Sequence, residues 1–225
     1  MAVPTKGSVK TGSPTPGGSN PYTFSNVTVN SGNNRLLVLQ LTTNDLRNHN
    51  SVTYGTGAAA QSMTSLFKIH RGGLDMKMSF WYLENPNVGT ANAIINLGGS
   101  MYNPISICFR AFTDSGGIGN HVNTNGGSSP RTGNITVEQD SLIMMTSSST
   151  TNIQTQQIPT GTNQSFVSHN INRRVGCSAI SSNAGHNAGS ISTRATAGSN
   201  LTMDRVEIKG INSSDTGADN FFLIM

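Results

Sequence analysis

Short runs of alternating apolar and polar residues cover most of this chain, and none of them has the period of a helix. The clearest run spans residues 76–84, where methionine and aromatic residues at even positions face one way and Lys77, Ser79 and Trp81 face the other. A period of two residues is typical of a β-strand with two distinct faces. The run therefore predicts a strand.

Turn residues separate these runs at intervals that are typical of β-sandwiches. Asn-Pro-Asn-Val-Gly at residues 85–89 favours a turn, because proline fixes φ and glycine accepts a positive φ. The expected strands are residues 24–29, 35–41, 52–54, 62–64, 66–69, 76–84, 91–97, 105–112, 135–137, 142–145, 165–169, 175–180, 191–196, 201–208 and 221–225. No helix fits, because glycine, asparagine or β-branched residues interrupt every candidate. Something near a dozen strands predicts two packed sheets of the jelly-roll type.

Three polar stretches fall outside this pattern. Residues 1–21 are rich in glycine, serine and threonine and contain four prolines, Pro4, Pro14, Pro16 and Pro21, so we interpret them as a flexible N-terminal arm. Residues 114–133 and 181–190 are rich in glycine, serine and asparagine, which predicts surface loops between strands. Residues 22–225 are then expected to form a single sandwich domain.

The composition agrees with an ordered β-protein and argues against disorder. Hydrophobic residues make up 34% of the chain and charged residues 11%, so little apolar material is available per residue. Disordered chains also tend to carry a high net charge, whereas the formal net charge here is +4. Valine, isoleucine and threonine, which favour strands, are abundant.

The distribution of charge and apolar residues bears on partners and location. The 14 lysines and arginines are scattered without a run, so we expect no nucleic-acid partner. No stretch approaches the roughly 18 apolar residues of a membrane span. The first residues lack the apolar segment of a secretory signal, and we therefore expect no conventional secretion in this form. A coat-like composition without an export signal favours a virion protein made in a host cytoplasm.

The middle of the chain carries a series of short motifs in a fixed order. They are Arg-Leu-Leu-Val at 35–38, Val-Thr-Tyr-Gly at 52–55, Met-Thr at 63–64, Trp-Tyr-Leu-Glu-Asn-Pro at 81–86 and Gly-Thr-Ala-Asn at 89–92. This series resembles a family of β-sandwich domains encoded by marine bacteria and their phages, over about half of the chain. Two later segments, 109–114 and 139–144, match more loosely, with Thr113 and Gln139 where the family has glycine. The resemblance implies jelly-roll modules on extracellular proteins and phage particles, and it names no catalytic residue.

Residues that could perform catalysis or hold a metal are few and scattered. Glu138 and Asp140 lie two positions apart, but a carboxylate pair that brackets a turn is typical of a solvated surface. The five histidines show no metal-ligand spacing, and neither cysteine has a histidine partner nearby in the sequence. We therefore predict no catalytic residue, no cofactor and no metal site. Cys108 and Cys177 are expected to be buried thiols, with a single bridge between strands as the alternative.

Several residues are candidates for contact with a glycan or with another surface. Trp81 lies inside the strongest strand and is expected in the core rather than on a sugar-binding platform. The candidates are Tyr54, Tyr102, His121, Arg131 and His186. The apolar end of the chain predicts either a final core strand or a contact between subunits, with Phe221, Phe222, Leu223 and Ile224 as its residues.

Three classes of function remain open from the sequence. The first is a non-enzymatic virion protein, either a capsid decoration protein or a spike or head fibre, with the major capsid protein as its partner. Such a protein is expected to form a homo-oligomer, for instance a trimer. The second is a glycan-binding adhesin or carbohydrate-binding module outside the cell or at its surface. An enzyme such as a glycosidase or lyase ranks third.

Overall fold

The structure is a computed structural model made almost entirely of β-strands. It describes residues 2–12, 20–43, 48–71, 76–99, 105–124, 130–149, 153–158, 165–171, 174–180, 185–197 and 201–211. These residues form 17 strands and one 3₁₀ turn at Gly57–Ala59, with no α-helix in the described ranges. The prediction of an all-β sandwich is confirmed.

Two sheets are built from the first half of the chain. Its strands are β1 (Thr5–Gly12), β2 (Tyr22–Val29), β3 (Leu36–Thr43), β4 (Ser51–Tyr54), β5 (Gln61–Ser62), β6 (Thr64–Arg71), β7 (Met76–Glu84), β8 (Gly89–Asn96) and β9 (Ile105–Thr113). The sheet that we name inner sheet 1 has the order β1-β9-β3-β7-β6, and outer sheet 1 has the order β2-β8-β4-β5.

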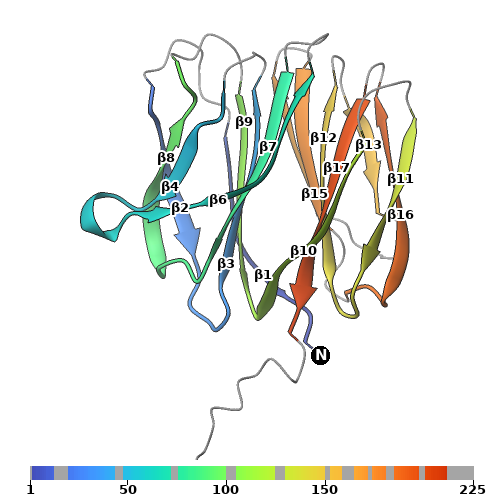
Figure 1. The fold of residues 1–225 in the computed structure, drawn as a ribbon, viewed down its shortest axis with the longest axis horizontal. Coiled ribbons are helices and arrows are strands. Elements are labelled where there is room, and N and C mark those ends of the chain that lie inside the picture. The colour runs from blue at the N-terminus through green and yellow to red at the C-terminus, as the bar shows by residue number, and fades with distance from the viewer. Residues whose placement is uncertain are drawn as a thin grey trace, which may run out of the picture.

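Two further sheets are built from the second half. Its strands are β10 (Ser115–Thr124), β11 (Arg131–Val137), β12 (Leu142–Ser149), β13 (Ile153–Gln157), β14 (Ser165–Ile171), β15 (Arg174–Ile180), β16 (Gly189–Ala197) and β17 (Leu201–Gly210). Inner sheet 2 has the order β10-β17-β12-β15-β14, and outer sheet 2 has the order β11-β16-β13. Figure 1 shows the four sheets side by side, with the two outer sheets at the flanks.

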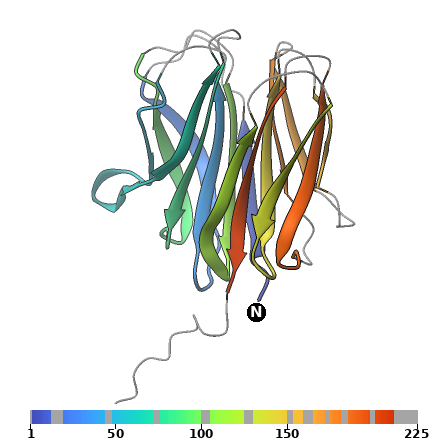
Figure 2. The same cartoon turned by 45° about the vertical axis from the view of Figure 1, so that its right-hand side comes forward.

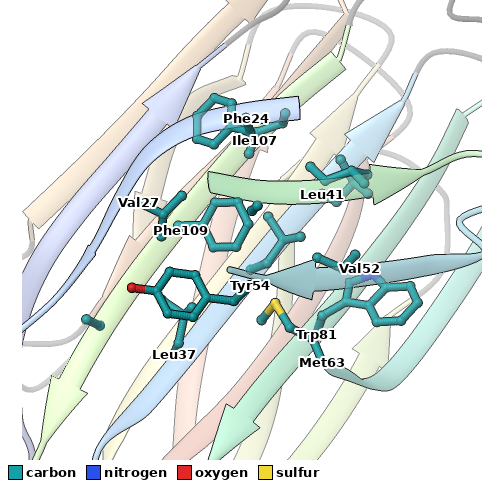
Figure 3. Close-up of a cluster of buried hydrophobic side chains, with 14 of the residues drawn as sticks. Phe24, Val27, Leu37, Leu41, Val52, Tyr54, Met63, Trp81, Ile107 and Phe109 are labelled. Carbon is teal, nitrogen blue, oxygen red and sulfur yellow. The ribbon is translucent and has the colours of Figure 1, made fainter. Parts of the chain in front are cut away.

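Each outer sheet packs on the inner sheet of its own half and encloses a core. The first core contains aromatic residues from both of its sheets, Phe24 and Tyr54 from outer sheet 1 and Trp81 and Phe109 from inner sheet 1 (Figure 3). The apolar cluster of the second core has no aromatic residue among the described ones and includes Ile143, Met145 and Met203. Each half is therefore a β-sandwich with its own hydrophobic core.

A third cluster of buried residues joins the two sandwiches. It contains Leu36, Val38, Phe80 and Phe112 from inner sheet 1, and Leu142, Met144, Val206 and Ile208 from inner sheet 2. Successive residues of a strand point to opposite faces, so even-numbered residues of β3 meet inner sheet 2 while odd-numbered ones fill the first core. All eight residues of β3 are consequently buried. This double burial explains why β3 is apolar at five of its eight positions and begins with four apolar residues in a row.

The two sandwiches have the same arrangement of strands. If β1 to β4 and β6 to β9 are matched in order with β10 to β17, the order β1-β9-β3-β7-β6 becomes β10-β17-β12-β15-β14, and β2-β8-β4 becomes β11-β16-β13. The short strand β5 has no counterpart. The strands thus form four sheets in two equivalent sandwiches, where we expected two sheets in one.

Details of register and backbone repeat as well. Val29 pairs with Gly89 in the first outer sheet, and Val137 pairs with Gly189 in the second. Both glycines have a positive φ, 120° and 138° respectively. Asn34 and Asp140, each two residues before the first leucine of β3 or β12, also share a positive φ, 44° and 61°. Such agreement is typical of two copies of one structural unit.

The N-terminal residues differ from the flexible arm that we expected. Thr5–Gly12 form β1, which pairs antiparallel with β9 and lies at the edge of inner sheet 1. The peptide bond before Pro21 is cis, and β2 begins at the next residue. Residues 13–19 lie outside the described ranges. The arm hypothesis is wrong for Thr5–Gly12, because an edge strand needs pairing on one side only and tolerates a polar sequence.

Part of an expected loop is also a strand. Residues 115–124, which we assigned to a long Gly-rich loop, form β10 and pair with β17 with two register shifts. A Cβ at Gly119 would lie 2.2 Å from Oε2 of Glu207, and one at Gly116 would lie 2.5 Å from the carbonyl oxygen of Gly210. The glycines therefore permit close packing of β10 on β17 rather than loop flexibility.

Deleting residues 1–12 tests whether β1 belongs to the fold. We expect the melting temperature to drop, because the outer edge of β9 loses its antiparallel partner and Phe112 loses cover. Thermal unfolding followed by circular dichroism measures the effect. The matched control, Lys10→Gln, keeps the backbone of β1 and should leave the melting temperature unchanged. An unchanged melting temperature after deletion would restore the arm hypothesis.

Replacing Trp81 tests its place in the first core. Trp81 is 3% exposed, so Trp81→Ala should lower the free energy of unfolding by about 3–5 kcal/mol through the cavity it leaves. Urea unfolding provides the measurement. Val88, which is 54% exposed, serves as the control, and Val88→Ala should change stability by less than about 0.5 kcal/mol. A Trp81→Ala protein of normal stability would contradict the core assignment.

Candidate functional site: buried polar networks

The most unusual group of ionisable residues lies on β17, a strand inside inner sheet 2. Its sequence contains Asp204, Arg205 and Glu207, and each of these side chains is at most 1% exposed. Asp204 points with Val206 toward inner sheet 1, while Arg205 and Glu207 point with Met203 toward outer sheet 2. Buried ionisable groups are costly unless they are paired, and they often mark functional sites.

Glu207 connects three segments of the second sandwich. Its carboxylate accepts hydrogen bonds from the backbone N–H of Asn120 at 2.8 Å, from the backbone N–H of Glu138 at 2.5 Å and from the Ser141 hydroxyl at 2.8 Å. Three donors satisfy most of the lone pairs of a carboxylate. Glu207 therefore ties β10 and the turn between β11 and β12 to β17, which is a structural role.

Arg205 occupies the second core at a position where the first core has an aromatic ring. Leu36 pairs with Phe112 and Leu142 pairs with Ile208, so Arg205 corresponds to Phe109. Its guanidinium donates to the hydroxyls of Thr124 and Thr193 and packs directly on Gly133, where a Cβ would collide with it. Burial lowers the pKa of Arg205, the charge of Asp204 raises it, and the charge of Arg131 lowers it.

Asp204 is the carboxylate of β17 that has fewer hydrogen-bond partners. Its Oδ1 accepts a hydrogen bond from the Asn123 amide, while its buried Oδ2 has no partner among the described residues. Burial raises the pKa of Asp204 to about 7, against the lowering effects of the Asn123 hydrogen bond and the charge of Arg205. Asp204 can therefore hold or release a proton near neutral pH, between the two sandwiches.

A second polar network lies in the first sandwich. Nδ1 of His49 is 2.6 Å from the Ser79 hydroxyl, its Nε2 is 2.9 Å from the Thr43 hydroxyl, and Trp81 donates from Nε1 to the Ser79 hydroxyl at 2.8 Å. A serine beside a histidine resembles a nucleophile and its base. Burial, together with the charges of Lys77 and Lys68, lowers the pKa of His49 to about 3.

The His49 network is better suited to structure than to catalysis. A base with a pKa near 3 accepts a proton poorly at neutral pH, because efficient bases have a pKa near the working pH. Ser79 is 2% exposed and His49 1% exposed, so a substrate would have no path to the hydroxyl. The network satisfies buried polar atoms and attaches residue 49 to β3 and β7.

Two residues that we expected at the surface are buried. Tyr54 is 2% exposed, lies in the first core and donates its hydroxyl to the carbonyl of Gly89 at 2.8 Å (Figure 3). His186 is 3% exposed and exchanges backbone hydrogen bonds with Ser141 and Asp140. Burial lowers the pKa of His186. Neither side chain is available to a glycan, because both are almost fully buried.

The other candidate residues do not form one site. His121 is exposed on β10 and its ring stacks on Phe67, with centroids 6.0 Å apart. Arg131 is half-buried at the start of β11, on a different sheet. Tyr102, Phe221, Phe222, Leu223 and Ile224 lie outside the described residues. Among the described candidates, the structure therefore does not bring His121 and Arg131 into one site.

The expected solvated carboxylate pair has local partners. Glu138 forms an ion pair with Lys209 at 2.6 Å, and its side chain is 47% exposed. Asp140 accepts a hydrogen bond from the Gln139 side chain at 2.9 Å. Within the described ranges, no three His, Cys, Asp or Glu side chains gather where they could hold a metal ion. Cys108 is buried and belongs to no disulfide, as expected, whereas the side chain of Cys177 is not described.

One cavity of about 220 Å³ opens at the end of the molecule where the sandwiches join. It is lined by Asn34, Arg35, Leu36, Glu84, Asn85, Ser115, Gly116, Gly117 and Ile211. Arg35 is already engaged, because it donates to the carbonyls of Pro86 at 2.9 Å and Gly32 at 2.7 Å. The cavity thus offers Glu84 as its remaining charged group.

The sequence did not reveal the networks around β17 and His49. The segment 201–208 was correctly expected as a strand, and its Asp-Arg-Val-Glu pattern reads as a solvated face when only one side of the strand is buried. A signal does exist in the glycines, since Gly119 and Gly133 lie where Glu207 and Arg205 need room. Finding it requires the pairing of strands far apart in the sequence.

Comparisons with known proteins identify no relative of this chain. The chain matches no protein family model, no curated protein and no solved structure. The resemblance to sandwich domains of marine bacteria and phages therefore rests on its sequence motifs alone. No helix in the described part of the chain is long and apolar enough to cross a membrane.

Asp204 predicts a specific dependence of stability on pH. Its pKa rises from 3.8 when unfolded to about 7 when folded, so the folded protein binds the extra proton between these values. The free energy of unfolding should fall as pH increases from 4 to 7, by at most about 1.4 kcal/mol per pH unit from this group, and level off above. Urea unfolding of the natural protein and of Asp204→Asn across this range isolates the contribution.

The stability of the natural protein relative to Asp204→Asn should therefore fall as pH rises to 7. Glu84→Gln is the matched control, because it removes one exposed carboxylate and should leave the pH profile of stability unchanged. Parallel profiles for the natural protein and Asp204→Asn would contradict the assignment.

Proposed function

We propose that this protein is a non-enzymatic structural protein of a virus particle, exposed on the particle as a capsid decoration protein or as a spike or head fibre. The observation that carries the proposal is the four-layer stack of sheets, in which both faces of each inner sheet are used for packing. Such a stack is rigid and leaves the outer faces and strand connections for contact with partners.

The polar chemistry of the described residues also supports a structural role. The carboxylate of Glu207 and the ring of His49 are engaged in hydrogen bonds inside the sandwiches rather than directed into a cleft. The second sandwich has eight strands, β10 to β17, in two sheets, which agrees with the jelly-roll type. The major capsid protein is the proposed partner, and a trimer or other symmetric homo-oligomer the proposed assembly.

Glycan binding is the competing function, and the burial of aromatic residues in the first core argues against it. Carbohydrate-binding sandwiches use exposed aromatic rings as platforms, but Trp81 and Tyr54 are 3% and 2% exposed. The candidate platform that remains from the sequence is Tyr102, which lies outside the described residues. A glycan function would therefore depend on a smaller aromatic surface than the sequence suggested.

Purified virus particles produced from the genome that encodes this chain provide the test. We expect the protein to remain on particles after a high-salt wash, in a copy number that matches a symmetry axis of the capsid. Quantitative mass spectrometry and cryo-electron microscopy measure copy number and position. An abundant host cytosolic protein should wash away and serves as the control.

Two outcomes would count against the virion role. Absence of the protein from washed particles contradicts it directly. Specific retention of the full chain on a glycan array, lost in a Tyr102→Ala variant, would establish the adhesin instead.

A further inference from the structure

The two sandwiches pack on each other through the same face. Inner sheet 1 corresponds strand by strand to inner sheet 2, and these two sheets form the contact. Equivalent positions also supply the apolar residues: Leu36 matches Leu142, and Phe112 matches Ile208, as their pairing shows. An interface that uses one surface patch on both partners is isologous, which is the geometry of a twofold dimer.

A hydrogen bond marks where the approximate twofold axis passes. Gln40 of β3 and Thr146 of β12 are equivalent, since each lies four residues after the matching leucines Leu36 and Leu142. The Gln40 amide donates to the Thr146 hydroxyl across the interface. In a twofold dimer, a residue touches its own counterpart only beside the axis. The axis therefore runs between β3 and β12.

Contacts at the two sides of the interface also follow the approximate twofold symmetry. On one side, β14 of the second sandwich lies against β1 and β9 of the first. On the other side, Phe67 of β6 stacks on His121 of β10. β1 matches β10 and β6 matches β14. The contact between β1 and β14 and the contact between β6 and β10 are therefore equivalent under the approximate twofold symmetry. The approximate symmetry thus extends across the whole width of the inner sheets.

The end of β17 and the segment before β1 also follow the approximate twofold symmetry. Asp114 alone separates β9 from β10, and β10 begins beside the end of β17, where Ser115 pairs with Gly210. At the matching place, Ala2 and Ile211 exchange two backbone hydrogen bonds of 3.0 Å, so β17 ends beside the start of the chain (Figure 2). A connection from β17 to β1 would therefore mirror the existing connection from β9 to β10.

We infer that this chain is a covalently joined dimer, in which the partner of each sandwich is a second version of the same sandwich. The face of the inner sheet is the interaction surface, and it is complementary to its own counterpart. The link at Asp114 is then a tether between two partners rather than a part of one core. This inference does not depend on the proposed function.

A cleavable tether tests the interface in the full-length protein. Asp114 is replaced by a flexible loop with a protease site, and the purified protein is cut. The cut protein should elute as one species with the mass of the intact chain and with an unchanged circular dichroism spectrum, because non-covalent contacts between the sandwiches hold the halves together. Two separate species of half the mass, at micromolar concentration, would overturn the inference.

A circular permutant tests the equivalence of the two connections. Residues 115–225 are followed directly by residues 1–114, so residues 225 and 1 are joined in the new tether and all 225 residues are kept. We expect a folded monomeric chain whose melting temperature lies within a few degrees of the natural protein. The control permutant opens the chain between Gln40 and Leu41, inside β3, and should fail to fold. If the first permutant also aggregates or unfolds, the inferred equivalence is wrong.

Discussion

The packing of one inner sheet on the other is the constraint on which the rest of the molecule depends. A sheet covered on both faces needs side chains that pack on both faces, and β3 and β12 are buried along their entire lengths. With hydrophobic residues at 34% of the chain, the apolar contact between the inner sheets is confined to one end, around Leu36 and Leu142. Small polar residues, Thr146 and Ser148, occupy the other end of β12. The interface is therefore apolar at one end and mostly polar at the other, where Met78 packs beside Ser148.

That polar end explains the unusual chemistry of β17. Asp204 corresponds to Cys108 in the first sandwich, and both face the interface. A carboxylate there loses water without gaining a second partner, and its pKa rises because burial favours the neutral acid. Glu207 is satisfied by the Ser141 hydroxyl and two backbone N–H groups. Arg205 donates to the hydroxyls of Thr124 and Thr193, and its Nε has no partner among the described residues. One strand therefore carries two structural charges and one that titrates.

Local sequence patterns were sufficient for strands with clear alternation. β7 and β9 lie where the apolar pattern predicts them, because each contributes ordered faces to a core. β1 and β10 escaped prediction, since edge strands carry polar residues and glycines that resemble loops. The assignment of Trp81 to the core was correct, because its side chain packs in the first core with Tyr54 from the facing sheet and with Met63.

Other features depend on contacts between distant segments and could not be predicted locally. The burial of Tyr54 and His186 requires Gly89 and Ser141, which lie 35 and 45 positions away along the chain. The equivalence of the two sandwiches is likewise hidden, because Phe109 and Arg205 share a position but no chemistry. Strand order and register preserve the relation after side chains have diverged.

The joined sandwiches limit where further partners can bind. The broad faces of the inner sheets already cover each other, so contacts with other chains must use the outer sheets or the strand edges. β1, β6, β10, β2 and β13 are edge strands with a register shift, and a bulged edge resists the addition of another strand. β11 and β14 pair without any shift and lie at sheet edges. Both belong to the second sandwich, whereas β5 of the first sandwich, an edge strand that also pairs without a shift, has only 2 residues. A partner that adds a strand to this protein would therefore find its longest regular edges in the second sandwich.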